Sequence, residues 1–182
     1  HLRPVRDLAM RVAVVGMGVQ GAKRRKVAGE DVVATVDPAI ETADFRDISE
    51  LDPDSYDAAL VCAPDLSKLD LLRVLLTSGK HVLVEKPLLA PSSGALRELA
   101  DLAEQYGVTC YTAYNHRFEP HFARMKALLD SGRLGKIYRC RLFYGNGTAE
   151  DVRRSAWRDQ GAGVLPDLGS HLLDTVLYWF GP

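Results

Sequence analysis

Apolar and polar residues alternate along the chain with two different periods. Short, nearly continuous apolar runs rich in valine are typical of buried strands, and the segments between them repeat apolar residues at helical spacing. Continuous apolar strands that alternate with amphipathic helices predict a parallel sheet covered by helices on both faces. The predicted strands are residues 11–15, 32–36, 58–62, 81–84 and 108–111.

Two of the predicted helices carry end signals. One has an apolar stripe over 69–76 that is opened by Ser67, with Asp70 three residues later in the spacing of a capping box, and is closed by Gly79. The other repeats the helical period over 93–107. Both helices therefore lie between predicted strands, which is the order that a doubly wound sheet requires.

The pattern changes after Tyr114. A helix is predicted over 120–130, a strand with one solvated face over 136–144, and a last helix over about 168–180. An alternating strand of this kind belongs to an antiparallel or mixed sheet, and one strand cannot form a stable sheet alone. The second domain is therefore expected to be incomplete in this chain.

These elements predict a Rossmann-type doubly wound parallel sheet, followed by the start of a second α+β domain with a mostly antiparallel or mixed sheet. The strand pattern begins directly after Met10. We therefore expect residues 1–9 to be an N-terminal extension, residues 10–115 to form the Rossmann domain, and residues 116–182 to begin the second domain.

Composition narrows the classes of function. The chain has 182 residues, 47% of them hydrophobic, and a formal net charge of -1, which gives no electrostatic reason to expect nucleic acid. No segment reaches the roughly 20 apolar residues of a membrane span. Cys62, Cys110 and Cys140 each lie in an apolar run without metal-ligand spacing, so we expect reduced core residues in a cytoplasmic protein without a metal site. The basic run 23–26 is one turn of helix and is expected to be a solvated face.

A glycine-rich string, VVGMGVQG, follows the first strand and opens a helix. In that context Gly16 permits a tight turn, Gly18 lets the backbone approach a pyrophosphate, and Gly21 allows close helix–strand packing. Asp37 ends the second strand, where its carboxylate can accept hydrogen bonds from ribose hydroxyls. Asp37 is followed by Pro38 and not by an arginine, which favours NAD over NADP. The predicted cofactor residues of the turn are Gly16, Met17, Gly18, Val19, Gln20 and Gly21.

The strand 81–84 ends in Glu85-Lys86-Pro87. Ligands of a doubly wound sheet bind outside the carboxyl ends of its strands, so Lys86 can donate hydrogen bonds to a substrate hydroxyl or carbonyl. Pro87 fixes the turn and can do so through a cis bond. Taken alone, the tripeptide favours the alternative, a surface Glu–Lys pair at a strand exit.

The string PDLGSHLLD places Asp167 and His171 four residues apart. In a helix both residues face the same side, and the potential at a helix N-terminus favours a neutral imidazole there. Such an imidazole can act as a general base in alcohol oxidation, with Asp167 to orient it or to hold a substrate hydroxyl. The alternative is an N-cap, Asp167 or Ser170, followed by a first-turn polar residue.

Taken together, the motifs resemble the glucose-fructose oxidoreductase and inositol dehydrogenase family (Gfo/Idh/MocA). The matching strings, in the order of the family, are VVGMGVQG, GKHVLVEKPL, YNHRFEP, SGRLGKI, WRD and GAGVLPDLGSHLLD. The resemblance implies that Lys86 is a catalytic or substrate-binding residue, that Pro87 is cis, and that Asp167 and His171 line the substrate site, with His171 as the acid/base. It also implies cofactor contacts at Ala63, Pro64, Glu85, Asn115, Trp157 and Arg158.

Two departures from the family pattern stand out. Lys68 occupies a position where many relatives have a histidine, and the chain stops after the first predicted strand and helix of a domain that relatives build on a large sheet. The expected activity is NAD(P)-dependent hydride transfer to or from a sugar, cyclitol or related polyol, with homo-oligomers expected for the full-length protein. The alternatives are an NAD-dependent glycoside hydrolase with transient oxidation, and a non-catalytic dinucleotide-binding protein.

Overall fold

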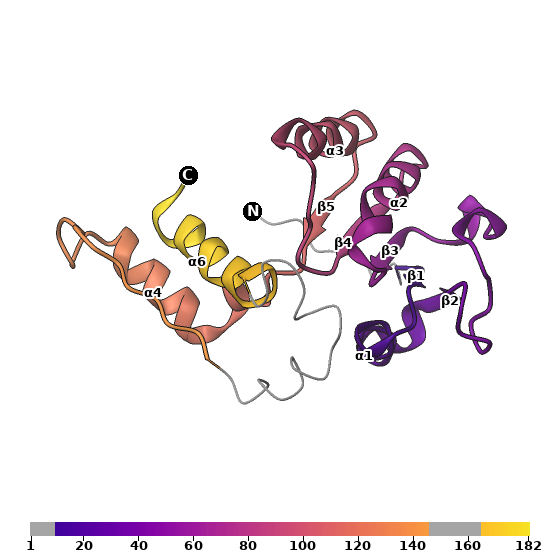
Figure 1. Cartoon of the computed structure of the whole chain (residues 1–182), viewed down its shortest axis with the longest axis horizontal. Helices are drawn as coiled ribbons and strands as arrows, with labels where there is room; N and C mark the ends of the chain where they lie inside the picture. The colour runs from indigo at the N-terminus through magenta and orange to yellow at the C-terminus, as the bar shows by residue number, and fades with distance from the viewer. Residues whose placement is uncertain (1–9, 146–164) are drawn as a thin grey trace. The chain divides into compact units, whose positions relative to one another are not determined.

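The computed structural model describes residues 10–145 and 165–182, and the chain divides into two compact units between Ala113 and Tyr114 (Figure 1). The strands of the first unit are β1 (Val12–Val15), β2 (Val32–Val36), β3 (Ala58–Val61), β4 (His81–Val84) and β5 (Cys110–Thr112). Its helices are α1 (Val19–Ala28), α2 (Asp65–Thr77) and α3 (Ser93–Gln105), with 3₁₀ turns at Gly29–Asp31, Ile48–Glu50 and Pro53–Ser55.

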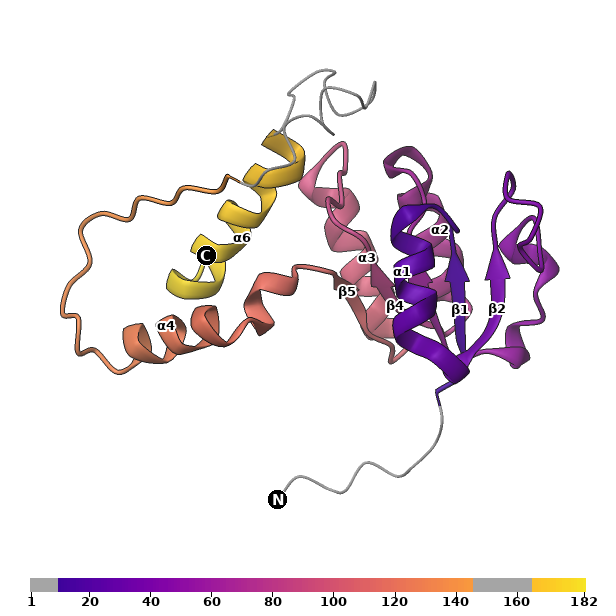
Figure 2. The same ribbon diagram turned by 90° about the horizontal axis from the view of Figure 1, so that it is seen from below.

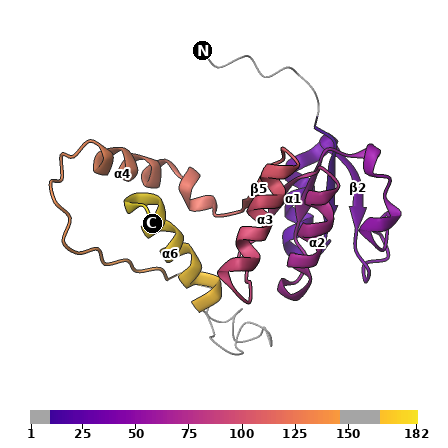
Figure 3. The same ribbon diagram turned by 90° about the horizontal axis from the view of Figure 1, so that it is seen from above.

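The described strands form one parallel sheet in the order β2-β1-β3-β4-β5. Helix α1 lies on one face of this sheet (Figure 2), and α2 and α3 lie on the other (Figure 3). Right-handed crossovers explain this division, because the chain leaves β1 toward one side of the sheet and leaves β3 toward the other. The neighbouring strands β1 and β3 therefore flank the topological switch point, where the predicted doubly wound fold binds its ligands.

The strand register aligns the carboxyl ends of all five strands. Val15 pairs with Val36 on one side and with Val61 on the other, Val61 pairs with Val84, and Val84 pairs with Thr112. The residues that directly follow these paired residues therefore lie in a row at one edge of the sheet. In spatial order they are Asp37, Gly16, Cys62, Glu85 and Ala113.

The core explains why the apolar runs predicted strands. Val61 and Val84 are fully buried, and α2 places Leu72, Leu75 and Leu76 against the same cluster. Burying each of these side chains contributes roughly 1.5 to 3 kcal/mol relative to leaving it exposed. The sheet is thus held rigidly, and its carboxyl edge is a fixed platform.

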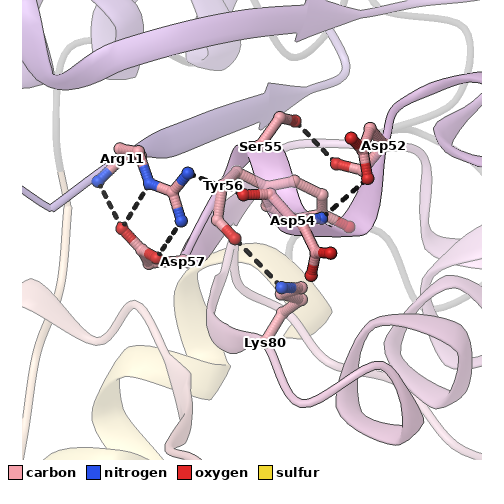
Figure 4. A network of polar contacts seen from close by, with 7 residues as sticks. All are labelled: Arg11, Asp52, Asp54, Ser55, Tyr56, Asp57 and Lys80. Atoms are coloured by element: carbon pink, nitrogen blue, oxygen red, sulfur yellow. Dashed lines mark hydrogen bonds and ion pairs between the residues drawn. The ribbon is translucent and has the colours of Figure 1, made fainter.

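Asp57 and Arg11 close the opposite, amino-terminal edge of this sheet (Figure 4). The Asp57 carboxylate accepts hydrogen bonds from Arg11 Nε, from a second guanidinium nitrogen and from the Arg11 backbone N–H, at 3.1, 2.7 and 2.9 Å. Lys80 donates to the Tyr56 carbonyl oxygen at 3.0 Å and lies over the Tyr56 ring. Hydrogen bonding by Arg11 lowers the pKa of Asp57 to about 2, so this carboxylate is a structural anchor at the edge away from the glycine turn.

The second unit consists, in its described part, of helices and an extended segment. A 3₁₀ turn at Asn115–Phe118 leads into α4 (Pro120–Asp130), and a π-helical turn at Leu165–Gly169 leads into α6 (Ser170–Phe180). The two helices are joined by Trp179, whose indole N–H donates to the Phe122 carbonyl oxygen at 3.2 Å. No helix of the described residues has the length and apolar character to span a bilayer.

Three local predictions are wrong. Helix α2 begins at Asp65 and not at Ser67, because Asp65 suits the positive N-terminus of a helix and the Ser67 hydroxyl bonds the Pro64 carbonyl oxygen. The segment 136–144 is extended but forms no ladder within the described residues, since no strand lies there to pair with it. Cys140, on this segment, is exposed and not a core residue.

Candidate active site

The glycine turn after β1 has the backbone that the motif predicts. Gly16 has a φ of +89°, and a Cβ there would lie 2.7 Å from the carbonyl carbon of Cys62, so only glycine fits. A Cβ on Gly21 would lie 1.8 Å from the Gly16 carbonyl oxygen, because α1 packs directly on the turn. Gly18 differs from both, since nothing lies within 4 Å of a Cβ placed on it. Gly18 is therefore the open position, and it is the glycine at which the motif predicts that phosphates approach the backbone.

Asp37 is fixed beside this turn. Its Oδ2 accepts the Met17 backbone N–H at 2.7 Å, and its Oδ1 accepts the N–H groups of Ala39 and Ile40 at 2.8 and 3.0 Å. Burial raises the pKa of Asp37, but these three donors outweigh burial and hold the pKa below its ordinary value. A carboxylate with a lowered pKa therefore stands next to the glycine turn, where it can accept hydrogen bonds from ribose hydroxyls and would repel a 2′-phosphate.

Cys62 and Ala63 follow β3, between the glycine turn and the end of β4. Burial, with the negative charge of Glu85, raises the pKa of the Cys62 thiol to about 12. A thiol with this pKa is neutral, so Cys62 supplies no thiolate nucleophile at this edge. Ala63 and Pro64 form the short connection into α2, on which the predicted backbone contact with a cofactor depends.

The Glu85-Lys86-Pro87 turn is held by basic side chains from two helices. Arg24 Nε of α1 donates to Glu85 Oε1 at 2.6 Å, and the Glu85 side chain is only 13% exposed. Lys68 of α2 donates to the carbonyl oxygens of Glu85 and Pro87, both at 2.8 Å. The Lys86–Pro87 peptide bond is cis, as predicted, and Lys86 is half-buried. The surface-pair alternative is thus wrong for Glu85, whose partner is Arg24.

Sequence reasoning missed Arg24 and gave Lys68 no role. The run 23–26 was expected to be solvated, which holds for Lys23, Arg25 and Lys26 but not for half-buried Arg24. A signal was available, because a carboxylate at the end of a buried strand needs a charged partner, and helix α1 leads away from the same edge.

His171 of the second unit is 5% exposed and is surrounded by rings of that unit. The His116 imidazole stacks on it with ring centroids 4.4 Å apart and planes 18° apart. Tyr114 and Tyr144 meet it edge-on, each at 5.8 Å. These rings give the imidazole one defined orientation. Sequence reasoning did not identify them, because they come from separate segments whose meeting no local pattern indicates.

Helical backbone already begins at Leu165, so His171 lies more than one turn inside the described helical segment. The effect of the helix N-terminus on its imidazole is therefore smaller than expected, since that effect fades after the first turn. Asp167 lies in the π-helical turn of the same segment and is half-buried, and its carbonyl oxygen accepts the Ser170 hydroxyl at 3.1 Å.

Asp174 of α6 is 7% exposed and forms an ion pair with Arg117. Arg117 Nε donates to the two carboxylate oxygens at 3.1 and 2.9 Å, and its guanidinium lies 5.4 Å from the Tyr178 ring centre. This fork fastens the 3₁₀ turn, and with it exposed Asn115, to α6.

Lys86 and the glycine turn belong to the first unit, and Asp167, His171 and Asn115 to the second. Each unit has an ordered part of the predicted site, and the convergence of Lys86 with His171 stays a prediction. Trp157 and Arg158 lie outside the described residues.

Comparison with known proteins identifies the family. Residues 1–114 match the model of the oxidoreductase family with an NAD-binding Rossmann fold, and residues 122–182 match the GFO/IDH/MocA C-terminal domain. The chain therefore belongs to the Gfo/Idh/MocA oxidoreductase family, as the motifs indicated.

Among the relatives, myo-inositol dehydrogenase Hyg17 of Streptomyces leeuwenhoekii is 31% identical over 92% of this chain and 48% of its own length. The scyllo-inositol 2-dehydrogenase (NADP(+)) IolW of Bacillus subtilis is 31% identical over 81% of this chain and 37% of its own. An NAD-binding oxidoreductase from Klebsiella pneumoniae has a similar crystal structure, with a TM-score of 0.77 and 25% identity over 94% of this chain and 53% of that one. The chain spans about half the length of the proteins it matches.

Proposed function

We propose that the protein is an NAD(P)-dependent oxidoreductase that transfers a hydride between nicotinamide and a hydroxyl-bearing carbon of a sugar, cyclitol or related polyol. One observation carries the proposal. The strand register sets Asp37, Gly16 and Glu85 in a single row at the carboxyl edge, with Lys86 next in the chain. Residues for a dinucleotide and a residue for a substrate oxygen thus share one edge of one rigid sheet.

The glycine turn fits a dinucleotide. Gly18 leaves open the space that a methyl group would fill, and α1 begins directly after it with free backbone N–H groups for phosphate oxygens. A bound nicotinamide supplies the hydride acceptor or donor. Asp37 favours NAD, since an ionised carboxylate accepts the ribose hydroxyls but repels a 2′-phosphate. The relative IolW, which is named for NADP, makes a direct comparison of the two cofactors necessary.

The side chains then divide the proton chemistry. His171 accepts the proton of the substrate hydroxyl during oxidation and returns it during reduction, and the stacked ring of His116 holds its orientation. The Lys86 ammonium donates a hydrogen bond to the same oxygen and stabilises the charge that develops on it. Asp167 orients the substrate or the imidazole. Two findings support the proposal that Lys86 and His171 act on one oxygen. The first is the family membership, and the second is the defined surroundings of each residue within its own unit.

The proposal is tested by following absorbance at 340 nm with NAD⁺ or NADP⁺ and a panel of sugars and cyclitols. Lys86→Met and His171→Gln are each expected to lower kcat about 100-fold or more while cofactor binding persists. Lys26→Met and His121→Gln are matched controls, because both residues are exposed, and neither should change kcat.

The other outcomes discriminate the alternatives. Release of an aglycone from a glycoside without net NADH would replace the proposal with a hydrolase that oxidises its sugar transiently. The protein would be a non-catalytic dinucleotide-binding protein if it binds the cofactor without turnover and Lys86→Met changes the binding of no ligand.

A further inference from the structure

Lys68 is a buried cation that the proposed chemistry does not use. It lies in the first turns of α2 and is 2% exposed. A lysine there is unfavourable on two counts, since burial removes its hydration and the helix N-terminus repels positive charge. Its position therefore needs specific partners.

The partners of Lys68 account for all three of its ammonium protons. Nζ donates to Asp65 Oδ1 at 2.6 Å, to the Glu85 carbonyl oxygen at 2.8 Å and to the Pro87 carbonyl oxygen at 2.8 Å. Asp65 supplies the counter-charge from the same helix. The two carbonyls belong to the residues immediately before and after Lys86, so one ammonium group binds the backbone on both sides of Lys86.

Two further contacts hold the start of this turn. The Glu85 N–H continues the sheet ladder to the Val61 carbonyl oxygen at 2.8 Å, and Arg24 holds the Glu85 carboxylate. Both contacts act on Glu85, upstream of Lys86. The hydrogen bonds from Lys68 instead reach the carbonyl oxygens on both sides of Lys86, and they tie this backbone to α2, whose core face is fully buried.

We propose that Lys68 is a positioning residue, which fixes the direction in which Lys86 leaves the carboxyl edge of the sheet. The inference rests on the proposed function, in which Lys86 donates to the substrate oxygen. Without Lys68, the backbone around Lys86 is still held at the end of β4 but is no longer hydrogen-bonded to α2. A misplacement of about 1 Å at such a group lowers the rate by up to about 100-fold.

The test compares Lys68→Met with Leu76→Ala in the intact chain. Methionine keeps the length of the side chain but removes the charge and the donors. Leu76 is a fully buried residue next to the C-terminal end of the same helix, so Leu76→Ala reports the effect of destabilising α2. Three quantities are measured for each variant: kcat with the polyol substrate, the dissociation constant for the cofactor, and hydrogen exchange in peptides covering 84–90.

Lys68→Met is expected to lower kcat about 10- to 100-fold, to leave the dissociation constant for the cofactor within about twofold, and to speed exchange over 84–90 relative to the rest of the sheet. Leu76→Ala is expected to lower the thermal midpoint without this pattern. Equal losses of kcat in both variants, or an unchanged kcat in Lys68→Met, would overturn the inference.

A fourth measurement separates this inference from the proposed function. The rate of acylation of the Lys86 amine is followed by mass spectrometry. It reports the exposure and orientation of this amine whether or not the protein turns over a polyol. If wild type shows no turnover, the proposed function fails. The positioning role is then decided by this rate and by exchange over 84–90, and unchanged values in Lys68→Met would reject it.

Discussion

Replacing Gly21 with alanine tests whether the contact between α1 and the glycine turn supports both the fold and the cofactor site. The new Cβ would lie 1.8 Å from the Gly16 carbonyl oxygen, whereas protein Cβ contacts are essentially never under 3.0 Å. The start of α1 or the turn must therefore move by about 1.2 Å. Overpacking of this kind costs typically about 1 to 3 kcal/mol.

Gly18→Ala is the matched variant with the opposite expectation for stability. The backbone φ is −64° and nothing lies within 4 Å of the added Cβ. Alanine is a poorer N-cap than glycine but also restricts the unfolded chain, so the free energy of unfolding should change by less than about 1 kcal/mol. Its methyl group nevertheless projects where phosphates are expected, and we predict at least about tenfold weaker cofactor binding, or about 1.4 kcal/mol.

The assay pairs urea unfolding with a titration of NADH fluorescence for each variant. Gly21→Ala should lose stability and affinity together, and Gly18→Ala should lose affinity alone. Gly94→Ala, on exposed α3 backbone with room for a Cβ, should leave affinity unchanged. Wild-type affinity in Gly18→Ala would show that no phosphate approaches this turn, and wild-type stability in Gly21→Ala would refute the packing argument.

Three further predictions concern charged groups. Because the pKa of Asp57 is lowered to about 2, its pairing with Arg11 should stabilise the fold above about pH 4 and lose this effect as pH falls toward 2. The thermal midpoints of wild type and Asp57→Asn should therefore converge in acid. A difference that stays constant with pH would contradict the pairing. Arg117→Ala leaves the carboxylate of Asp174 buried without its main donor, so it should cost roughly 2 to 4 kcal/mol and speed hydrogen exchange in α6; unchanged exchange there would rule this out. Asp37→Ser removes the charge beside the glycine turn and should lower the ratio of the NADP⁺ to the NAD⁺ dissociation constant about tenfold or more, whereas an unchanged ratio, measured by calorimetry, would mean that this carboxylate does not set the cofactor preference.

The parallel sheet could be predicted because its determinants are local. Buried strands in such a sheet are continuous apolar runs, and two of the three glycines of the turn occupy positions that have no room for a Cβ. Gly16 and Gly21 illustrate this directly, since a side chain at either would collide with backbone of the turn or of the connection after β3. The row of residues at the carboxyl edge then follows from the order and register of the strands.

The supports of the site could not be predicted in the same way. Lys68 meets the Pro87 carbonyl 19 residues away, and Arg24 meets Glu85 across 61 residues. Such contacts depend on the three-dimensional placement of helices against strand ends, which periodicity does not contain. The alternating segment 136–144 failed for the converse reason, because its pattern is that of a strand but a ladder needs a partner strand.

Amide chemical shifts measured during a titration with NADH show directly whether a dinucleotide binds along the carboxyl edge of the sheet. We predict perturbations at Met17, Gly18 and Val19 in the glycine turn and at Glu85 and Lys86 after β4, with little change at the Arg11–Asp57 edge. Perturbations at that opposite edge, or none in the glycine turn at millimolar NADH, would contradict it.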